Sequence, residues 1–166
     1  MLAFWITVTL TFALDRISKA VALAQLTLGE RLVALPGLLE WRLSHNQGMA
    51  LGFLSGRPVL NLLLPLLAIL GGWLLLRHYR TTGFTRFAMA LVVGGFLGNM
   101  MDRVVLGYVP DMVYFPWMPW YICNLADVAI CIGVALLAAS LIFRPEDWHL
   151  KGEGDAHGAH RTDRPA

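Results

Sequence analysis

Four apolar stretches, each about as long as a bilayer is thick, constrain this chain most. They run from Leu2 to about Leu26, Val59 to Leu76, Phe87 to Leu106 and Cys123 to Phe143. A helix needs roughly 20 apolar residues to cross about 30 Å of hydrocarbon. Lipid offers the backbone no hydrogen-bond partners, so each stretch is expected to be helical. The sequence therefore predicts an all-α membrane protein with four transmembrane helices.

Composition agrees with this class and excludes several others. The chain is 57% hydrophobic and 14% charged, whereas soluble domains carry about 25% charged residues. No basic stripe points to a nucleic-acid partner. Cys123 and Cys131 form no CxxC pair, and residues 1–143 contain only His45 and His78 and no HExxH motif. We therefore expect no metal and no cofactor.

Basic residues indicate how the helices are oriented. The link 77–86 holds three arginines and the segment after the fourth stretch starts at Arg144, whereas residues 107–122 contain no lysine or arginine. Positive charge favours the cytoplasmic side of a membrane. The link 77–86 and both termini are thus expected in the cytoplasm, with the segments 27–58 and 107–122 outside.

The two outer segments differ in pattern. Residues 27–58 contain the short runs ERLVAL, LLEWRLS and MALGF, broken by Pro36-Gly37 and by Asn46-Gln47-Gly48. Such runs predict a small β-rich element. The segment YVPDMVYFPWMPWY is rich in aromatic residues and proline, which suits an interfacial belt, a flap over a site, or both. We expect one membrane domain over 1–143 and a polar, disordered cytoplasmic tail over 144–166.

The first helix is expected to be retained rather than cleaved as a signal peptide, because Asp15, Arg16 and Lys19 interrupt it. Asp15 and Lys19 are four residues apart, acid first, which favours a mutual ion pair. A supporting role at a functional site is the alternative for this pair.

The third stretch carries a face of small and polar residues. Gly94 and Gly98 form a small-xxx-small pair for close helix packing. Gly95, Asn99 and Asp102 lie on one face, which must point at protein because an acid at membrane depth is costly. Asp102, beside Arg103, is interpreted as a structural ion-pair or hydrogen-bond centre, in preference to a catalytic role.

Asp111 and Asp127 are harder to explain structurally. Asn124 is a plausible N-cap for the fourth helix, so Asp127 can simply compensate the helix dipole. Yet a short outward link joins the two acids, and two close carboxylates share one proton. That arrangement activates water in aspartic peptidases. A proton-coupled transporter or channel using the acids as a relay, and a lipid-binding module without enzyme activity, are alternatives.

Taken together, the motifs resemble those of lipoprotein signal peptidase, also called signal peptidase II. The blocks that carry the resemblance are DRISK (15–19), NQGMALG (46–52), GGFLGNMMDR (94–103) with GYVPD (107–111), and NLAD (124–127). They occur in order over roughly residues 10–135.

The resemblance implies a membrane aspartic peptidase with four transmembrane helices, a periplasmic β-cradle and a short periplasmic helix or flap between helices three and four. Such an enzyme cleaves bacterial prolipoproteins on the amino side of a diacylglyceryl-modified cysteine. It would lie in the inner membrane as a monomer, without cofactor, and act near the periplasmic face. Asp111 and Asp127 would be catalytic. The residues that would bind substrate or support the pair are Asp15, Lys19, Asn46, Gly48, Ala50, Asn99, Asp102, Arg103, Asn124 and Ala126.

Three positions depart from the family pattern. Leu51 stands where phenylalanine is usual, and Pro110 and Met112 flank Asp111 where valine and phenylalanine are usual. Pro110 favours an extended Val109. These changes bear on the shape of the pocket, and they leave both carboxylates in place.

Overall fold

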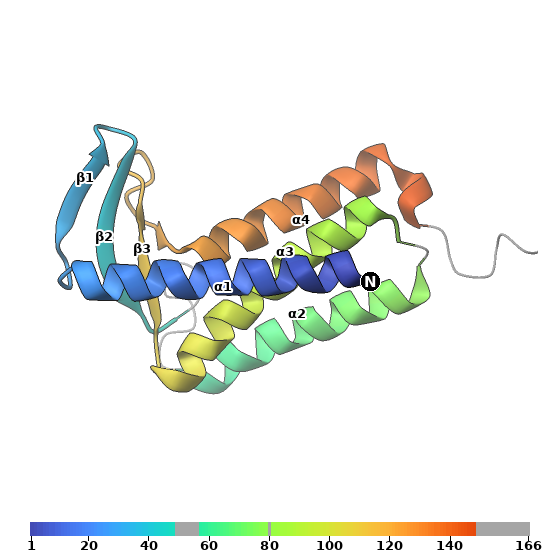
Figure 1. Ribbon diagram of the computed structural model, residues 1–166, viewed down its shortest axis with the longest axis horizontal. Coiled ribbons are helices and arrows are strands. Elements are labelled where there is room, and N and C mark those ends of the chain that lie inside the picture. The colour runs from blue at the N-terminus through green and yellow to red at the C-terminus, as the bar shows by residue number, and fades with distance from the viewer. Residues whose placement is uncertain (49–56, 80, 149–166) are drawn as a thin grey trace, which may run out of the picture.

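The computed structural model describes residues 1–48, 57–79 and 81–148. These residues form four long helices and a small sheet (Figure 1). The helices are α1 (Leu2–Gln25), α2 (Pro58–His78), α3 (Gly83–Val105) and α4 (Leu125–Phe143). The strands are β1 (Arg31–Leu35), β2 (Leu39–Asn46), β3 (Val109–Tyr114) and β4 (Ile122–Cys123).

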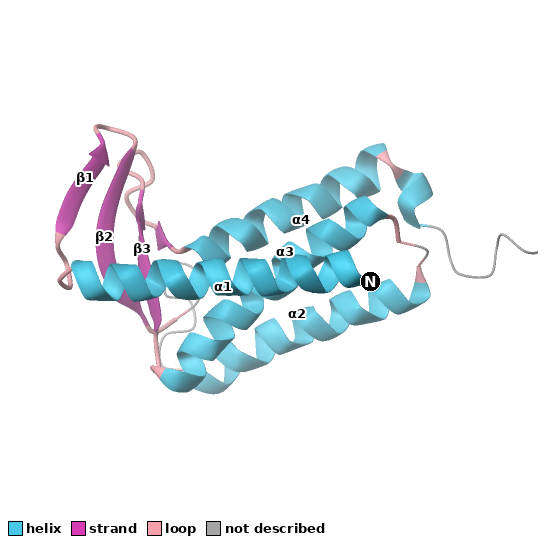
Figure 2. Ribbon diagram, viewed as in Figure 1, coloured by secondary structure: helices cyan, strands magenta, loops and turns pink. Residues whose placement is uncertain are grey.

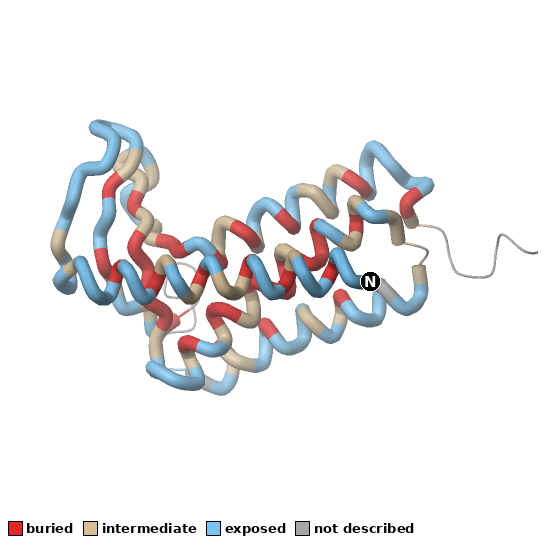
Figure 3. Tube along the Cα trace, viewed as in Figure 1, coloured by how far each residue is buried: buried red, intermediate tan, exposed pale blue. Residues whose placement is uncertain are grey.

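The helices lie side by side, and the sheet covers one end of the bundle (Figure 2). The N-terminus, the link from α2 to α3 and the end of α4 lie at the opposite end. Buried residues lie where the helices face one another, and exposed apolar residues cover the outer faces (Figure 3). The core at the end away from the sheet includes Phe4 and Val8 of α1 with Met89 and Val93 of α3.

The four helices coincide with the four predicted stretches to within a few residues. Among the described residues, α3 and α4 have the length and apolar character needed to cross a membrane, and α2 contains a shorter apolar stretch, Val59–Leu75. Every 18-residue window of α1 contains Asp15, Arg16 and Lys19, so its charges set it apart from the other helices.

The predicted β-rich element is present in part. Residues 30–46 form β1 and β2 as expected, whereas the MALGF run lies outside the described residues. The sheet order is β1-β2-β3-β4, all antiparallel, so the link between α3 and α4 supplies two strands that were not predicted. Residues 107–124 contain no helix, and the short helix implied by the resemblance is not found there.

The small-residue face of α3 packs as predicted. A Cβ added at Gly94 would lie 2.7 Å from Cβ of Thr11 and 3.0 Å from the carbonyl oxygen of Val8, both on α1. A Cβ added at Gly95 would lie 2.6 Å from the carbonyl oxygen of Ala126 on α4. Glycine is required here because neighbouring backbones approach too closely for a side chain.

The packed part of the chain continues past residue 143, where the polar tail was placed. Pro145–Trp148 forms the 3-10 helix η2. Asp147 on η2 is 1% exposed and accepts a hydrogen bond from Ser140 Oγ at 3.1 Å. Trp148 Nε1 also donates to Ser140 Oγ, so η2 is fastened to the last turns of α4.

Gly94→Ala should lower the free energy of unfolding by about 1–3 kcal/mol, because the new methyl group would displace α1. Gly71→Ala on α2 is the matched control, since nothing lies within 4 Å of its Cβ position. It should be neutral or stabilise by up to about 1 kcal/mol. Thermal unfolding of the purified variants in detergent measures both, and equal effects would contradict the close approach of α1 and α3.

Candidate active site

Asp111 and Asp127 come together where the sheet meets the helical bundle. Asp111 lies on β3 and is 2% exposed. Asp127 lies in the first turn of α4 and is half-buried. Asn124 links them, because its Nδ2 donates to Asp111 Oδ1 at 2.6 Å and its Oδ1 accepts from the backbone N–H of Asp127 at 3.0 Å.

The start of α4 fixes one half of this pair. Asn124 is the N-cap, as predicted, and Asp127 completes a capping box by accepting a hydrogen bond from the backbone N–H of Asn124 at 3.4 Å. These contacts satisfy N–H groups that have no partner within the helix. The structure therefore places Asp127 at the helix N-terminus, where the dipole favours a negative charge.

The sheet fixes the other half. β3 pairs with β2 so that Asp111 lies opposite Ser44 and Val109 lies opposite Asn46. Asn46 Nδ2 reaches Asp111 Oδ2 at 2.8 Å. Pro110 is accommodated within β3 and pairs with His45, so this departure from the family pattern leaves Asp111 on an extended strand.

Three asparagine amides present their NH2 groups to the two carboxylates, and each amide is held by a donor on its oxygen. Asn124 is held by the backbone N–H of Asp127, and Asn46 by the backbone N–H of Gly48 at 3.0 Å. Asn99 Nδ2 donates to Asp127 Oδ1 at 2.7 Å, while Asn99 Oδ1 accepts from Lys19 Nζ at 2.8 Å.

A buried ion cluster lies beneath the pair. Lys19 Nζ contacts Asp15 Oδ2 at 2.8 Å and Asp102 Oδ2 at 2.7 Å, and all three side chains are 0% exposed. Arg16 also pairs with Asp102. The predicted Asp15–Lys19 pair is confirmed.

Asp102 is a structural ion-pair centre, as predicted, but its partners are Lys19 and Arg16 rather than its neighbour Arg103. Adjacent residues on a helix point about 100° apart, so Asp102 faces α1 while Arg103 turns toward Gly48, which follows β2. Arg103 Nη1 donates to the carbonyl oxygen of Asn99 at 3.1 Å and Nη2 donates to that of Gly48 at 3.3 Å. The role of Arg16 was missed, because no local spacing relates it to Asp102.

Asp15 also ties the cluster to α4. Its Oδ1 accepts a hydrogen bond from the backbone N–H of Ala126 at 3.0 Å. A Cβ at Gly98 would clash with the Asp15 carboxylate, so the carboxylate fits against α3 only because Gly98 has no side chain. Helices α1, α3 and α4 are therefore joined directly below Asp127.

Burial raises the pKa of Asp111 to about 7, and the negative charge of Asp127 raises it in the same direction. The hydrogen bonds from Asn46 and Asn124 oppose this rise. Burial also raises the pKa of the Cys123 thiol to about 12, so this thiol stays protonated and is a poor nucleophile. The Asp111 carboxyl therefore titrates close to neutral pH, whereas the Cys123 thiol does not.

A cavity of about 270 Å³ opens at Asp127. Its polar lining residues are Asn46, Asn99, Arg103, Tyr121, Asn124 and Asp127. Its apolar lining residues are Pro65, Phe96, Val109, Ile130 and Cys131. The buried Nε of Arg103 has no hydrogen-bond partner within the described residues. The cavity thus joins the Asp127 carboxylate, a cation and an apolar wall, and Asp111 borders it through hydrogen bonds to the lining residues Asn46 and Asn124. Tyr121 is a lining residue that sequence reasoning did not single out.

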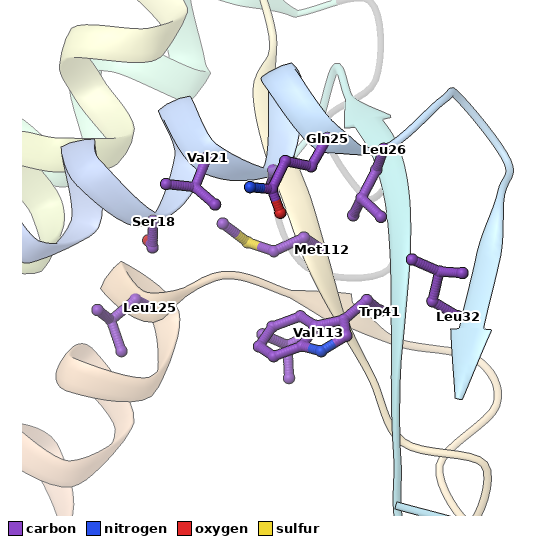
Figure 4. A pocket seen from close by; sticks show the side chains of 10 residues that line it. Ser18, Val21, Gln25, Leu26, Leu32, Trp41, Met112, Val113 and Leu125 are labelled. Atoms are coloured by element: carbon purple, nitrogen blue, oxygen red, sulfur yellow. The ribbon is translucent and has the colours of Figure 1, made fainter. Parts of the chain in front are cut away.

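A larger cavity of about 520 Å³ lies between α1, the sheet and the start of α4 (Figure 4). Met112, the neighbour of Asp111 on the strand, points into it together with Val21 of α1 and Trp41 of β2. Met112 lines this larger cavity, whereas Asp111 hydrogen-bonds to Asn46 and Asn124, which line the smaller one. No acid lines the larger cavity, and Asp127 lines the smaller.

The structure thus brings together nearly all the predicted site residues. Asn46 is the last residue of β2 and Gly48 follows two residues later, and Ala126 lies fully buried beside the cluster. Ala50 and Leu51 lie outside the described residues. The described residues contain no group of three or more His, Cys, Asp or Glu that could hold a metal ion.

Comparisons with known proteins agree on one family. The family model for signal peptidase (SPase) II matches residues 7–143. The lipoprotein signal peptidase of Pseudomonas aeruginosa (strain UCBPP-PA14) is 40% identical over 163 residues, covering 93% of this chain and 92% of that protein. The lipoprotein signal peptidase of Halothermothrix orenii is 31% identical over 153 residues, covering 91% and 99% respectively.

The fold also matches a solved structure. A bacterial membrane enzyme structure at 2.3 Å resolution superposes with a TM-score of 0.80 at 20% identity, covering 100% of this chain and 96% of that one. At this identity the likeness concerns the fold alone.

Proposed function

This chain belongs to the signal peptidase II family of aspartic peptidases, and we propose that Asp111 and Asp127 are the catalytic pair with which it removes signal peptides from prolipoproteins. The observation that carries the proposal is the link through Asn124, which hydrogen-bonds to the Asp111 carboxylate and to the backbone of Asp127. A pair held in this way carries one shared proton near neutral pH.

The chemistry follows from that shared proton. The ionised carboxylate takes a proton from water, and the resulting hydroxide attacks the scissile carbonyl. The protonated partner donates a hydrogen bond to the carbonyl oxygen as negative charge develops on it. Collapse of the tetrahedral intermediate transfers a proton to the leaving amine. No acyl-enzyme forms, because water is the nucleophile.

The cavity suits a lipid-modified peptide. Its lining combines an apolar wall, which includes Phe96 of α3 and Ile130 of α4, with polar side chains beside Asp127. Arg103 adds a cation to this lining. We propose cleavage on the amino side of the diacylglyceryl-modified cysteine, with the segment 115–121 as a flap that excludes bulk water.

A proton relay is not favoured as an alternative. The titratable pair lies at one end of the bundle, where the sheet meets it, rather than along a path through it. The relatives that match over most of the chain are peptidases.

The same geometry suggests how the chain lies in the membrane. All four helices span it, and the charges of α1 are accommodated because Lys19 and Arg16 pair with Asp15 and Asp102. Both described ends of the chain and the 77–86 link lie at the end away from the sheet. We place that end in the cytoplasm and the pair near the periplasmic face of the inner membrane, in a monomeric enzyme.

Asp111→Asn and Asp127→Asn should each lower kcat by roughly 10²–10⁴-fold or more, because neither amide can exchange the proton. The assay is cleavage of a purified diacylglyceryl-modified prolipoprotein. Asp147→Asn is the matched control, since Asp147 is a buried aspartate at the opposite end of the bundle. It should cost stability and leave kcat unchanged. If either Asp111→Asn or Asp127→Asn cleaves at the wild-type rate, these two residues are not the catalytic pair.

The pH dependence should report Asp111. Because its pKa is raised to about 7, the carboxyl keeps its proton below that pH and loses it above. The kcat/KM value should therefore fall above about pH 7 with a slope of one proton. Asn46→Ala removes a hydrogen bond that lowers the pKa of Asp111. In this variant the fall of kcat/KM on the alkaline side of the pH profile should therefore move to higher pH.

Glu146→Gln is the control for this profile, because Glu146 is exposed on η2, far from the pair. In Glu146→Gln, kcat/KM should fall at the same alkaline pH as in the wild type. If Asn46→Ala also gives the wild-type pH profile, the titration of Asp111 does not determine the alkaline fall of kcat/KM.

The orientation can be tested by labelling single cysteines with a membrane-impermeant maleimide, in a Cys131→Ser background. Pro119→Cys should react in intact cells, and Gly83→Cys should react only after the membrane is opened. Both positions are exposed, at opposite ends of the bundle. Buried Cys123 should stay unlabelled. The reverse pattern would invert the topology.

A further inference from the structure

We propose that Lys19 is a positioning residue for the catalytic pair, acting through the side-chain amide of Asn99. This inference rests on the proposed function and assigns a task to a residue that does not itself reach the cavity. Lys19 is fully buried, and Asn99 lies between it and Asp127.

The argument begins with the donors of Lys19. An ammonium group has three N–H donors and no acceptor. Its contacts here are Asp15 Oδ2 at 2.8 Å, Asp102 Oδ2 at 2.7 Å and Asn99 Oδ1 at 2.8 Å, all acceptors. If the amide of Asn99 turned over, its NH2 group would face the ammonium and one buried donor would lose its partner. Lys19 therefore permits one orientation of Asn99.

The orientation of the Asn99 amide determines which of its groups faces the Asp127 carboxylate. With its oxygen on Lys19, Asn99 must present Nδ2 to Asp127 Oδ1, which it does at 2.7 Å. The carboxylate oxygen that accepts this short N–H hydrogen bond is the weaker base of the two oxygens of Asp127. The other oxygen, Oδ2, has the weaker contact, 3.4 Å from the backbone nitrogen of Asn124. Proton exchange with water is thereby assigned to Oδ2.

The surrounding charges indicate that Lys19 acts by contact rather than through its field. On α1 and α3, Lys19 and Arg16 are balanced by Asp15 and Asp102. The other charged or titratable groups near Asp127 are Arg103 on α3, Asp111 on β3, Tyr121, and Cys123 and Cys131. Because the cluster is neutral as a whole, its main effect on the pair passes through the Asn99 amide.

The test must remove the donor without leaving an unbalanced buried charge. Lys19→Met alone leaves Asp15 and Asp102 facing only Arg16, which threatens folding. The paired variant Asp15→Asn/Lys19→Met keeps the cluster neutral. Compared with the wild type, it should lower kcat by about 10–100-fold, because the amide of Asn99 is free to turn. KM should stay within about threefold, because Lys19 does not line the cavity.

A double-mutant cycle separates positioning from a general structural role. Asn99→Leu removes the amide through which Lys19 is proposed to act. In that background the paired substitution should lower kcat no further. If the paired substitution lowers kcat by the same factor in the Asn99→Leu background as in the wild type, the proposal is overturned. Wild-type kcat in the paired variant would overturn it as well.

Asn99→Asp provides a second route that leaves Lys19 and its partners in place. One carboxylate oxygen still accepts from Lys19, and the other replaces the NH2 group with an acceptor aimed at Asp127. The kcat value should fall at neutral pH and recover in part at lower pH, where the new carboxyl is protonated and donates. Wild-type kcat at neutral pH, or a loss that acid does not relieve, would overturn the proposal.

The outcome is distinguishable from failure of the proposed function. If Asp127→Asn cleaves normally, the catalytic pair itself is wrong. If Asp127→Asn is inactive while the cycle between Lys19 and Asn99 is multiplicative, the pair stands and the positioning role falls.

Discussion

The buried ammonium of Lys19 is the contact on which the rest of the structure depends. It lies between Asp15 of its own helix and Asp102 of α3, and Asp15 in turn accepts from the backbone of Ala126 at the start of α4. Charges inside an apolar bundle are tolerated only when they are paired and hydrogen-bonded. A shift of any of the three helices would break such a pair. The register of α1, α3 and α4 is thus set directly below the two acids.

The sheet positions the second of the two acids. Asp127 is held by a helix N-terminus, whereas Asp111 is held by the pairing of β3 with β2. The two carboxylates therefore come from different elements of the fold, and Asn124 at the start of α4 connects them. Alternation along β3 sends Met112 to a separate apolar cavity. Substitution at Met112 can reshape that cavity without moving Asp111, which explains how this position can depart from the family pattern.

The features that could be predicted from the sequence are those determined by interactions between residues close together in the chain. The helices follow from apolar length, the Asp15–Lys19 pair from four-residue spacing, and the cap at Asn124 from its place before α4. Long-range pairing was not predictable in this way. The addition of β3 to the sheet and the pairing of Asp102 with Arg16 depend on elements far apart in the chain. Spacing alone left Asp111 and Asp127 with structural alternatives, and the matching motif blocks made the stronger case for a pair.

Burial accounts for two requirements of this chemistry at once. A lipid-modified substrate needs an apolar wall, which the helices supply beside Asp127. The same exclusion of water raises the pKa of Asp111 to about 7, because a second negative charge close to Asp127 is poorly solvated. In the proposed mechanism, a cavity open enough to ionise both acids would also be too wet to hold the lipid of the substrate. The proposed shared proton and the proposed binding of a lipid-modified substrate would therefore have a common cause, the low dielectric where the sheet closes over the bundle.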